Sequence, residues 1–225
     1  MGKITWLGHA AFSVELDGKV VLVDPFLSGN PKASTRPEDI SRADVVIVTH
    51  DHPDHFGDCV AISKRLGSKV VALYETAAKA QSQGASIVGA NIGSGFDVEG
   101  LRVAFTMAVH TGNPSGVVVA GGEFSFYHSG DTGLFGDMKL IGQRYKPHVA
   151  LLPIGGFYTM GFEDAAIATS WVKPRVVIPM HYGTFPGIEG EPKKFEAAVR
   201  RSSPRTKVVV LKQGESVQVP LRSGR

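Results

Sequence analysis

The chain has 225 residues, a formal net charge of +3 and 43% hydrophobic residues, which is the composition of an ordinary folded globular protein. No apolar run approaches the roughly 20 residues that a membrane-spanning helix requires. The amino-terminal segment MGKITWLGHA lacks the pattern of a signal peptide. These features predict one cytoplasmic domain over residues 1–225 without a membrane span. The single cysteine, Cys59, excludes an internal disulfide.

The first half of the chain alternates strand and helix signals. Two strands are expected within residues 4–16, then a hairpin turn at Asp17 and Gly18 and a third strand at 19–25. The nearly continuous apolar run at 43–50 predicts a strand covered on both faces. A helix at 59–67, a strand at 68–74 and a helix at 75–84 are expected to follow.

The second half repeats this order of elements without repeating the sequence. We expect strands at 101–110, 115–122, 123–131, 147–156, 173–181, 207–212 and 215–220, with helices at 162–173 and 192–201. Hairpins followed by alternating strands and helices, twice over, predict an α/β fold of two packed sheets with helices outside. The basic stretch at 193–207 is interrupted by Glu196 and has the spacing of an exposed helix followed by a strand, so nucleic-acid binding is not expected.

Four predicted strands end in a histidine or an aspartate: His50, His110, Asp131 and His181. Binding sites in α/β proteins usually lie at the carboxyl ends of strands, where loops vary while the strands stay rigid. We therefore expect these four side chains to share one edge of the fold. A histidine at a strand end is also often only a hydrogen-bonded polar group, so each of the four is weaker evidence alone than together.

The segment THDHPDH adds three more candidates, His52, Asp54 and His55, within six residues of His50. Imidazole and carboxylate groups are the ligands preferred by zinc and similar divalent ions. The seven side chains comprise five histidines and two carboxylates, which is too many for one tetrahedral ion and suits two ions that share a bridge. The alternative is a solvated polar loop.

These motifs resemble the metallo-β-lactamase superfamily. The resemblance is carried by THDHPDH, His110, the GDTG around Asp131 and the MHYG around His181. It implies a four-layer αβ/βα sandwich of two mixed sheets, with a two-metal site along one edge. The segments WLGHAAF, DPFLSGNP and GGFYTMGFEDAA further resemble small metal-dependent hydrolases of the ascorbate-6-phosphate lactonase-like group.

The resemblance assigns His50, His52 and His110 to one ion and Asp54, His55 and His181 to the other, with Asp131 as the bridge. It implies two divalent cations per chain, zinc being expected and manganese, iron or nickel being alternatives. Two such ions can generate a bridging hydroxide near neutral pH. Asp54 is then expected to accept its proton as a catalytic residue.

Three further residues have two interpretations each. His9 is expected near the mouth of the site, as a catalytic residue that bonds substrate or a metal ligand; the alternative is a structural histidine. Asp24 is expected either to accept the free N–H of a ligand histidine or to cap a turn before Pro25. His128 either supports the site or is a buried strand histidine. The loop at 155–161, which carries Phe157 and Tyr158, forms either a pocket wall or an ordinary turn.

The sequence thus predicts a dinuclear metal-dependent hydrolase that acts on a small, anionic substrate such as a phosphodiester or a lactone. An RNA-processing nuclease and a non-catalytic or di-iron sensing module on the same fold are the alternatives. The resemblance to lactonases also implies assembly into a homo-oligomer.

Overall fold

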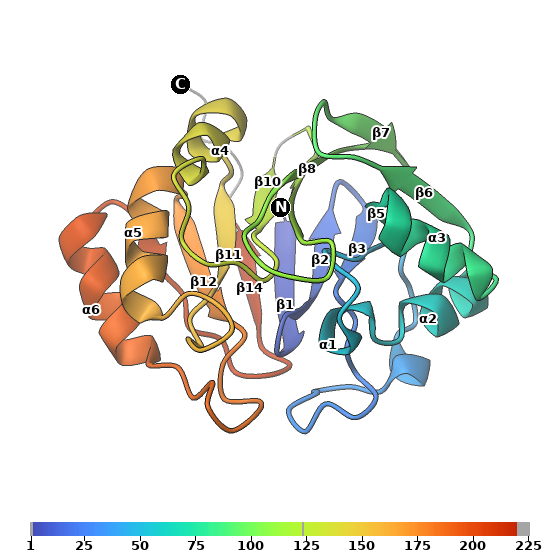
Figure 1. Cartoon of the computed structure of the whole chain (residues 1–225), viewed down its shortest axis with the longest axis horizontal. Helices are drawn as coiled ribbons and strands as arrows, with labels where there is room; N and C mark the ends of the chain where they lie inside the picture. Colours follow the sequence, from blue (N-terminus) through green and yellow to red (C-terminus); the bar gives the residue numbers. More distant parts are fainter. Residues whose placement is uncertain (1, 123, 220–225) are drawn as a thin grey trace.

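Two seven-stranded sheets pack face to face in the computed structural model, which describes residues 2–122 and 124–219. Each sheet has an antiparallel part and a parallel part (Figure 1). In order across the first sheet, the strands are β14 (Ser216–Val219), β1 (Gly2–Gly8), β2 (Ala11–Leu16), β3 (Lys19–Val23), β4 (Val45–Ile47), β5 (Lys69–Leu73) and β6 (Ile87–Ala90). In the second they are β13 (Lys207–Val208), β12 (Val176–Met180), β11 (Val149–Pro153), β10 (Ser125–His128), β9 (Ser115–Ala120), β8 (Leu101–Met107) and β7 (Phe96–Val98).

Helices cover the outer face of each sheet (Figure 1). The first sheet carries α2 (Cys59–Leu66) and α3 (Tyr74–Ser82), and the second carries α4 (Met138–Tyr145), α5 (Phe162–Val172) and α6 (Pro192–Ser202). One apolar cluster fills the space between the two sheets. A second lies between the first sheet and its helices, and a third lies between the second sheet and its helices. This arrangement confirms the predicted four-layer αβ/βα sandwich.

Local chemistry explains where several elements turn or end. Asp17 and Gly18 have φ values of 50° and 74°, which is the geometry of the tight hairpin turn expected between β2 and β3. Helix α2 ends at Gly67, whose φ of 70° and N–H bond to the Ser63 carbonyl form the left-handed cap that glycine favours.

The predicted strand at 43–50 is shorter in the structure. Only Val45–Ile47 form β4, because the chain then leaves the sheet ladder and the Thr49 N–H donates to the Asp24 carboxylate instead. The expected strand at 207–212 likewise shrinks to Lys207–Val208. The expectations at residues 123 and 220 lie outside the described residues.

Several short elements were not predicted: β6, β7, α4, the one-turn helix α1 (Pro53–Phe56) and a 3-10 turn (Pro37–Asp39). Strands β6 and β7 are edge strands of four and three residues, too short to show a clear alternation. Helix α4 contains Gly142, which lowers its helix propensity, yet this glycine lets the backbone approach the Trp171 carbonyl of α5. Tertiary packing therefore overrides the local signal here.

Candidate metal centre

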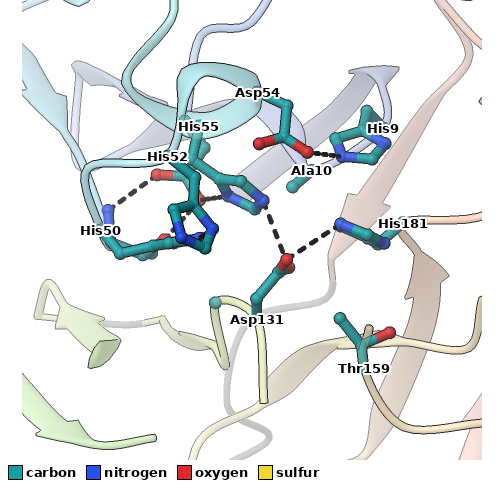
Figure 2. Close-up of polar contacts among 12 residues, drawn as sticks. His9, Ala10, His50, His52, Asp54, His55, Asp131, Thr159 and His181 are labelled. Carbon is teal, nitrogen blue, oxygen red and sulfur yellow. Dashed lines mark hydrogen bonds and ion pairs between the residues drawn. The ribbon is translucent and has the colours of Figure 1, made fainter. Parts of the chain in front are cut away.

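All seven predicted ligands lie together at one edge of the fold, in loops that follow four strands. His50 and His52 follow β4, and the short helix α1 carries Asp54 and His55. The other three come after β8, β10 and β12 and are His110, Asp131 and His181. Figure 2 shows the His50–His55 segment facing Asp131 and His181 from the opposite sheet. The two sheets thus contribute opposite sides of one cluster.

One group of ligand atoms is made of three histidines. His50 Nε2 lies 3.2 Å from His52 Nδ1, and His110 Nε2 lies 3.3 Å from the same atom. The three nitrogens all lie within 4.8 Å of one another, so one cation could contact all of them. These are the three residues that the family resemblance assigned to the first ion.

A second group contains His9 and the three residues that the family resemblance assigned to the second ion. One atom from each of Asp54, His55, His181 and His9 lies within 4.8 Å of the other three. His9 and His181 are in close contact, with ring centroids 3.9 Å apart.

Asp131 lies between the two groups and is 3% exposed. Its Oδ1 is 3.2 Å from His55 Nε2, while its Oδ2 is 3.0 Å from His181 Nε2 and 3.7 Å from His110 Nε2. This position between both groups is the one that a bridging carboxylate requires.

Several buried polar atoms of the cluster form no hydrogen bond of good geometry among the described residues: His55 Nε2, Asp131 Oδ1 and both ring nitrogens of His181. The short distances from His55 and His181 to Asp131 are therefore close approaches of polar atoms without well-aligned hydrogen bonds. Leaving a buried donor or acceptor unsatisfied costs about 1–3 kcal/mol per group. Because three of these atoms, His55 Nε2, Asp131 Oδ1 and His181 Nε2, meet around Asp131, and all are of types that bind divalent ions, the residues present fit a bound cation.

The histidines of the cluster differ in the direction in which their surroundings shift the pKa. Burial lowers the pKa of His50 to about 2 and also lowers that of His110, so both are neutral near pH 7, as metal ligands must be. His55 behaves differently: burial opposes its charge, but Asp131 and Asp24 outweigh burial and raise its pKa well above the usual value. These two carboxylates therefore stabilise positive charge at this point, whether it is a proton or a metal ion.

Asp24 anchors the loop that carries His50 to His55. It is fully buried, and its carboxylate accepts the Thr49 N–H at 2.8 Å, the Thr49 hydroxyl at 2.7 Å and a bond from His55 Nδ1 at 2.7 Å. The bond to Nδ1 turns the other ring nitrogen, Nε2, toward Asp131. Of the two interpretations of Asp24, the structure shows the acceptor of a histidine N–H.

His9 is fully buried and both of its ring nitrogens have partners. Nδ1 lies 2.9 Å from the Thr184 hydroxyl, and Nε2 lies 3.2 Å from Asp54 Oδ2. Burial lowers the pKa of His9 to about 4, despite the bond to Asp54 that raises it. Because His9 is buried and bonded to Asp54, the structure favours a His9 that contacts a candidate metal ligand over a His9 that contacts substrate directly.

His128 stands behind the cluster. Its Nδ1 accepts the Gly130 N–H at 3.1 Å, and its Nε2 donates to the Ala10 carbonyl at 2.9 Å. It belongs to none of the groups that could hold a metal, so it supports the loop before Asp131 and is not itself a candidate ligand.

Sequence reasoning missed two threonines that hold the site together, Thr49 and Thr184. Thr49 directly precedes His50, and its carbonyl also accepts the N–H and hydroxyl of Ser115. Thr184 lies three residues after His181. Nothing in their residue type distinguishes them from surface threonines; position next to a candidate ligand was the one available signal.

Aromatic side chains border the site. Phe26 and Phe185 lie 5.9 and 5.5 Å from the His9 ring, measured between centroids. The loop at 155–161 is closed by a bridge between Gly155 and Gly161, and Figure 2 places its Thr159 beside Asp131 and His181. Its Phe157 is 82% exposed. Within residues 2–122 and 124–219, no lysine or arginine forms an ion pair with any of the seven candidate ligands.

Comparisons with known proteins show the family and the fold. Residues 3–181 match the family described as beta-lactamase superfamily domain. A metal-dependent hydrolase of the UPF0173 group from Methanopyrus kandleri is 51% identical over 96% of this chain and 99% of its own length. A second, from Thermofilum pendens, is 49% identical over 98% of this chain and 100% of its own. The solved structure of Igni18, a metallo hydrolase from Ignicoccus hospitalis, is similar with a TM-score of 0.90 at 41% identity, over 96% of this chain and 97% of that one.

No helix within residues 2–122 and 124–219 is both long enough and apolar enough to cross a bilayer.

Proposed function

Since the chain belongs to the beta-lactamase superfamily domain family and is a metal-dependent hydrolase, we propose that it works with two divalent cations, zinc being expected. The observation that carries this proposal is that the ligand atoms form two groups, each within 4.8 Å, and that a third group of His50, His55 and Asp131 overlaps both of them. His50, His52 and His110 would hold one cation, Asp54, His55 and His181 would hold the other, and Asp131 would be shared by both.

Two bound cations of this kind would lower the pKa of a shared water toward neutrality and polarise the substrate oxygen. The remaining requirements fall on the chain's own residues. Asp54 is the more exposed of the two candidate carboxylates: 30% of its side chain is exposed, against 3% for Asp131. Its pKa is held well below the usual value because His9 and His55 outweigh burial. The low pKa keeps Asp54 ionised but also makes it a weak base, so proton transfer to it requires that the cations first lower the pKa of the water. With that condition, the role proposed for Asp54 is to accept the proton of this water.

The proposed substrate is a small, anionic ester, either a phosphodiester or a lactone derived from a sugar. Recognition of the negative charge is proposed to fall to the cations. The partly exposed rings of Phe26 and Phe185 would contact the apolar part of such a substrate. The proposed location of the reaction is the cytoplasm.

The first test is the metal content of protein purified without an affinity tag or chelator. Close to two equivalents of one transition metal per chain is expected, and hydrolysis of bis(p-nitrophenyl) phosphate or of a γ-lactone series should depend on them. Asp131→Asn and Asp54→Asn should abolish turnover while the circular dichroism spectrum is retained. Asp51→Asn is the matched control, because Asp51 lies in the same loop but pairs with Lys79 outside the cluster.

Turnover that survives both substitutions would overturn the two-cation proposal. So would protein that binds fewer than two equivalents after incubation with excess zinc, manganese, iron and nickel in turn.

A further inference from the structure

We propose that Thr184 and His9 form a hydrogen-bonded relay that fixes the carboxylate of Asp54, which makes Thr184 a positioning residue for the second cation. The relay runs from the Thr184 hydroxyl to His9 Nδ1, at 2.9 Å, and from His9 Nε2 to Asp54 Oδ2, at 3.2 Å. The inference rests on the proposed function, because it assigns a task to a residue behind one of the proposed ligands.

The direction of each bond follows from the groups involved. An ionised carboxylate can only accept hydrogen bonds, so His9 Nε2 must carry the hydrogen that points to Asp54. In a neutral imidazole the other nitrogen then has a lone pair and no hydrogen. The Thr184 hydroxyl must therefore donate to Nδ1, and this donation holds His9 in the Nε2–H tautomer.

The ring of His9 is held firmly in this orientation. The residue is fully buried and has a left-handed backbone, with a φ of 55°. Its carbonyl accepts the Trp6 indole N–H at 2.9 Å and the His181 N–H at 3.0 Å. Phe26 and Phe185 pack edge-on against the ring. The His181 ring also lies against it, with centroids 3.9 Å apart, so three rings and two hydrogen bonds hold the His9 side chain in place.

Asp54 needs such a brace because it is the one candidate carboxylate that solvent reaches. It lies on the four-residue helix α1 and is 30% exposed, whereas Asp131 is fixed by burial. The hydrogen bond from His9 to Oδ2 fixes the orientation of the Asp54 carboxylate relative to the ring nitrogens of His55 and His181. Loss of a hydrogen-bonding partner behind a metal ligand typically weakens metal binding by about 10–100-fold.

The test removes the Thr184 hydroxyl and measures zinc binding directly. Thr184→Val keeps the shape of the side chain, and Thr184→Ser keeps the hydroxyl. Thr169→Val is the matched control, because that threonine is equally buried but donates to the Ala165 carbonyl inside α5, away from the site. Apo protein is titrated with zinc in competition with a chromophoric chelator.

For Thr184→Val, one of the two zinc equivalents should bind about 10–100-fold more weakly than in the wild type. Thr184→Ser and Thr169→Val should bind both equivalents as the wild type does. Unchanged binding of both equivalents by Thr184→Val overturns the relay. A wild type that binds fewer than two equivalents contradicts the proposed function instead, and the relay is then decided by the second measurement.

The second measurement is the tautomer of His9, read from the ring ¹⁵N shifts of histidine-labelled protein with and without zinc. An Nε2–H signal for His9 in both states supports the relay, and its loss or broadening is expected in Thr184→Val. An Nδ1–H tautomer in the apo protein overturns the relay. Loss of the Nε2 hydrogen when zinc is added also overturns it, because His9 would then be a ligand itself.

Discussion

Replacement of Asp24 by asparagine is the sharpest test of how the cluster is held. The side chain keeps its size, and asparagine tolerates the left-handed backbone that Asp24 adopts at a φ of 45°. The substitution removes the negative charge and replaces one acceptor oxygen of the carboxylate with an NH₂ donor. Asp24 accepts three bonds, two from Thr49 and one from His55, and the amide nitrogen of asparagine would face at least one donor in place of an acceptor.

The expected magnitude follows from these contacts. Loss of a bond between a carboxylate and a ligand histidine weakens metal binding by about 10–100-fold, which is about 1.4–2.7 kcal/mol. The apo fold should also lose about 1–3 kcal/mol of unfolding free energy, because a buried donor is left without a partner. In the apo protein the pKa of His55 should fall, since Asp24 is one of the two groups that raise it.

The assay is zinc competition against a chelator, with urea unfolding of the apo protein alongside. Asp58→Asn serves as the control, because Asp58 also accepts two bonds, from the N–H groups of Leu27 and Ser28, but contacts no histidine of the cluster. Asp24→Asn that binds zinc within twofold of the wild type would refute the reasoning. Equal losses in both variants would show that only loop structure is being measured.

Two further predictions concern the fold. The unfolding free energy of the apo protein should fall as pH drops from about 6.5 to about 4, because the lowered pKa values of His9 and His50 mean that the unfolded chain binds more protons. The slope is at most about 1.4 kcal/mol per pH unit for each histidine, and urea unfolding across this range that stays flat would contradict it. Gly142→Ala should destabilise the protein by about 1–3 kcal/mol despite the better helix propensity of alanine, since a Cβ there would lie 2.6 Å from the Trp171 carbonyl oxygen. Gly136→Ala, with nothing within 4 Å of the added carbon, should be close to neutral in the same unfolding assay.

The candidate ligands could be predicted from sequence because their signal is made of two parts that reinforce each other. Each lies just after an apolar strand, and parallel neighbours such as β11 and β12 bring their carboxyl ends to one edge. The residue types are also costly to bury together unless a cation compensates them. His50 and His181 are 131 residues apart in the sequence, yet the same rule places both at that edge.

The supporting contacts could not be predicted in the same way. The Thr184 hydroxyl bonds to His9, and Thr49 bonds to Asp24 and Ser115 through its hydroxyl and its backbone. These partners lie far away in the sequence, on loops of unknown course. Asp24 had two interpretations, since the choice between a turn cap and a bond to His55 depends on where α1 lies. Helix α4 was missed because Gly142 weakens the local signal, while its packing against α5 is a tertiary effect.

The backbone around the cluster indicates how firmly its geometry is imposed. His9, Asp24 and His181 all adopt left-handed conformations, with φ values of 55°, 45° and 55°. Such conformations cost about 1–3 kcal/mol each and persist only where the surrounding structure determines them. Here the His181 N–H donates to the His9 carbonyl, so these two residues hold each other, while the Asp24 N–H donates to the Ile47 carbonyl of β4. The three strained residues therefore tie β1, β3 and β12 to the candidate ligands. A chain that folds this way orients its ligand atoms before any cation arrives, and the binding energy of the cation need not be used to assemble them.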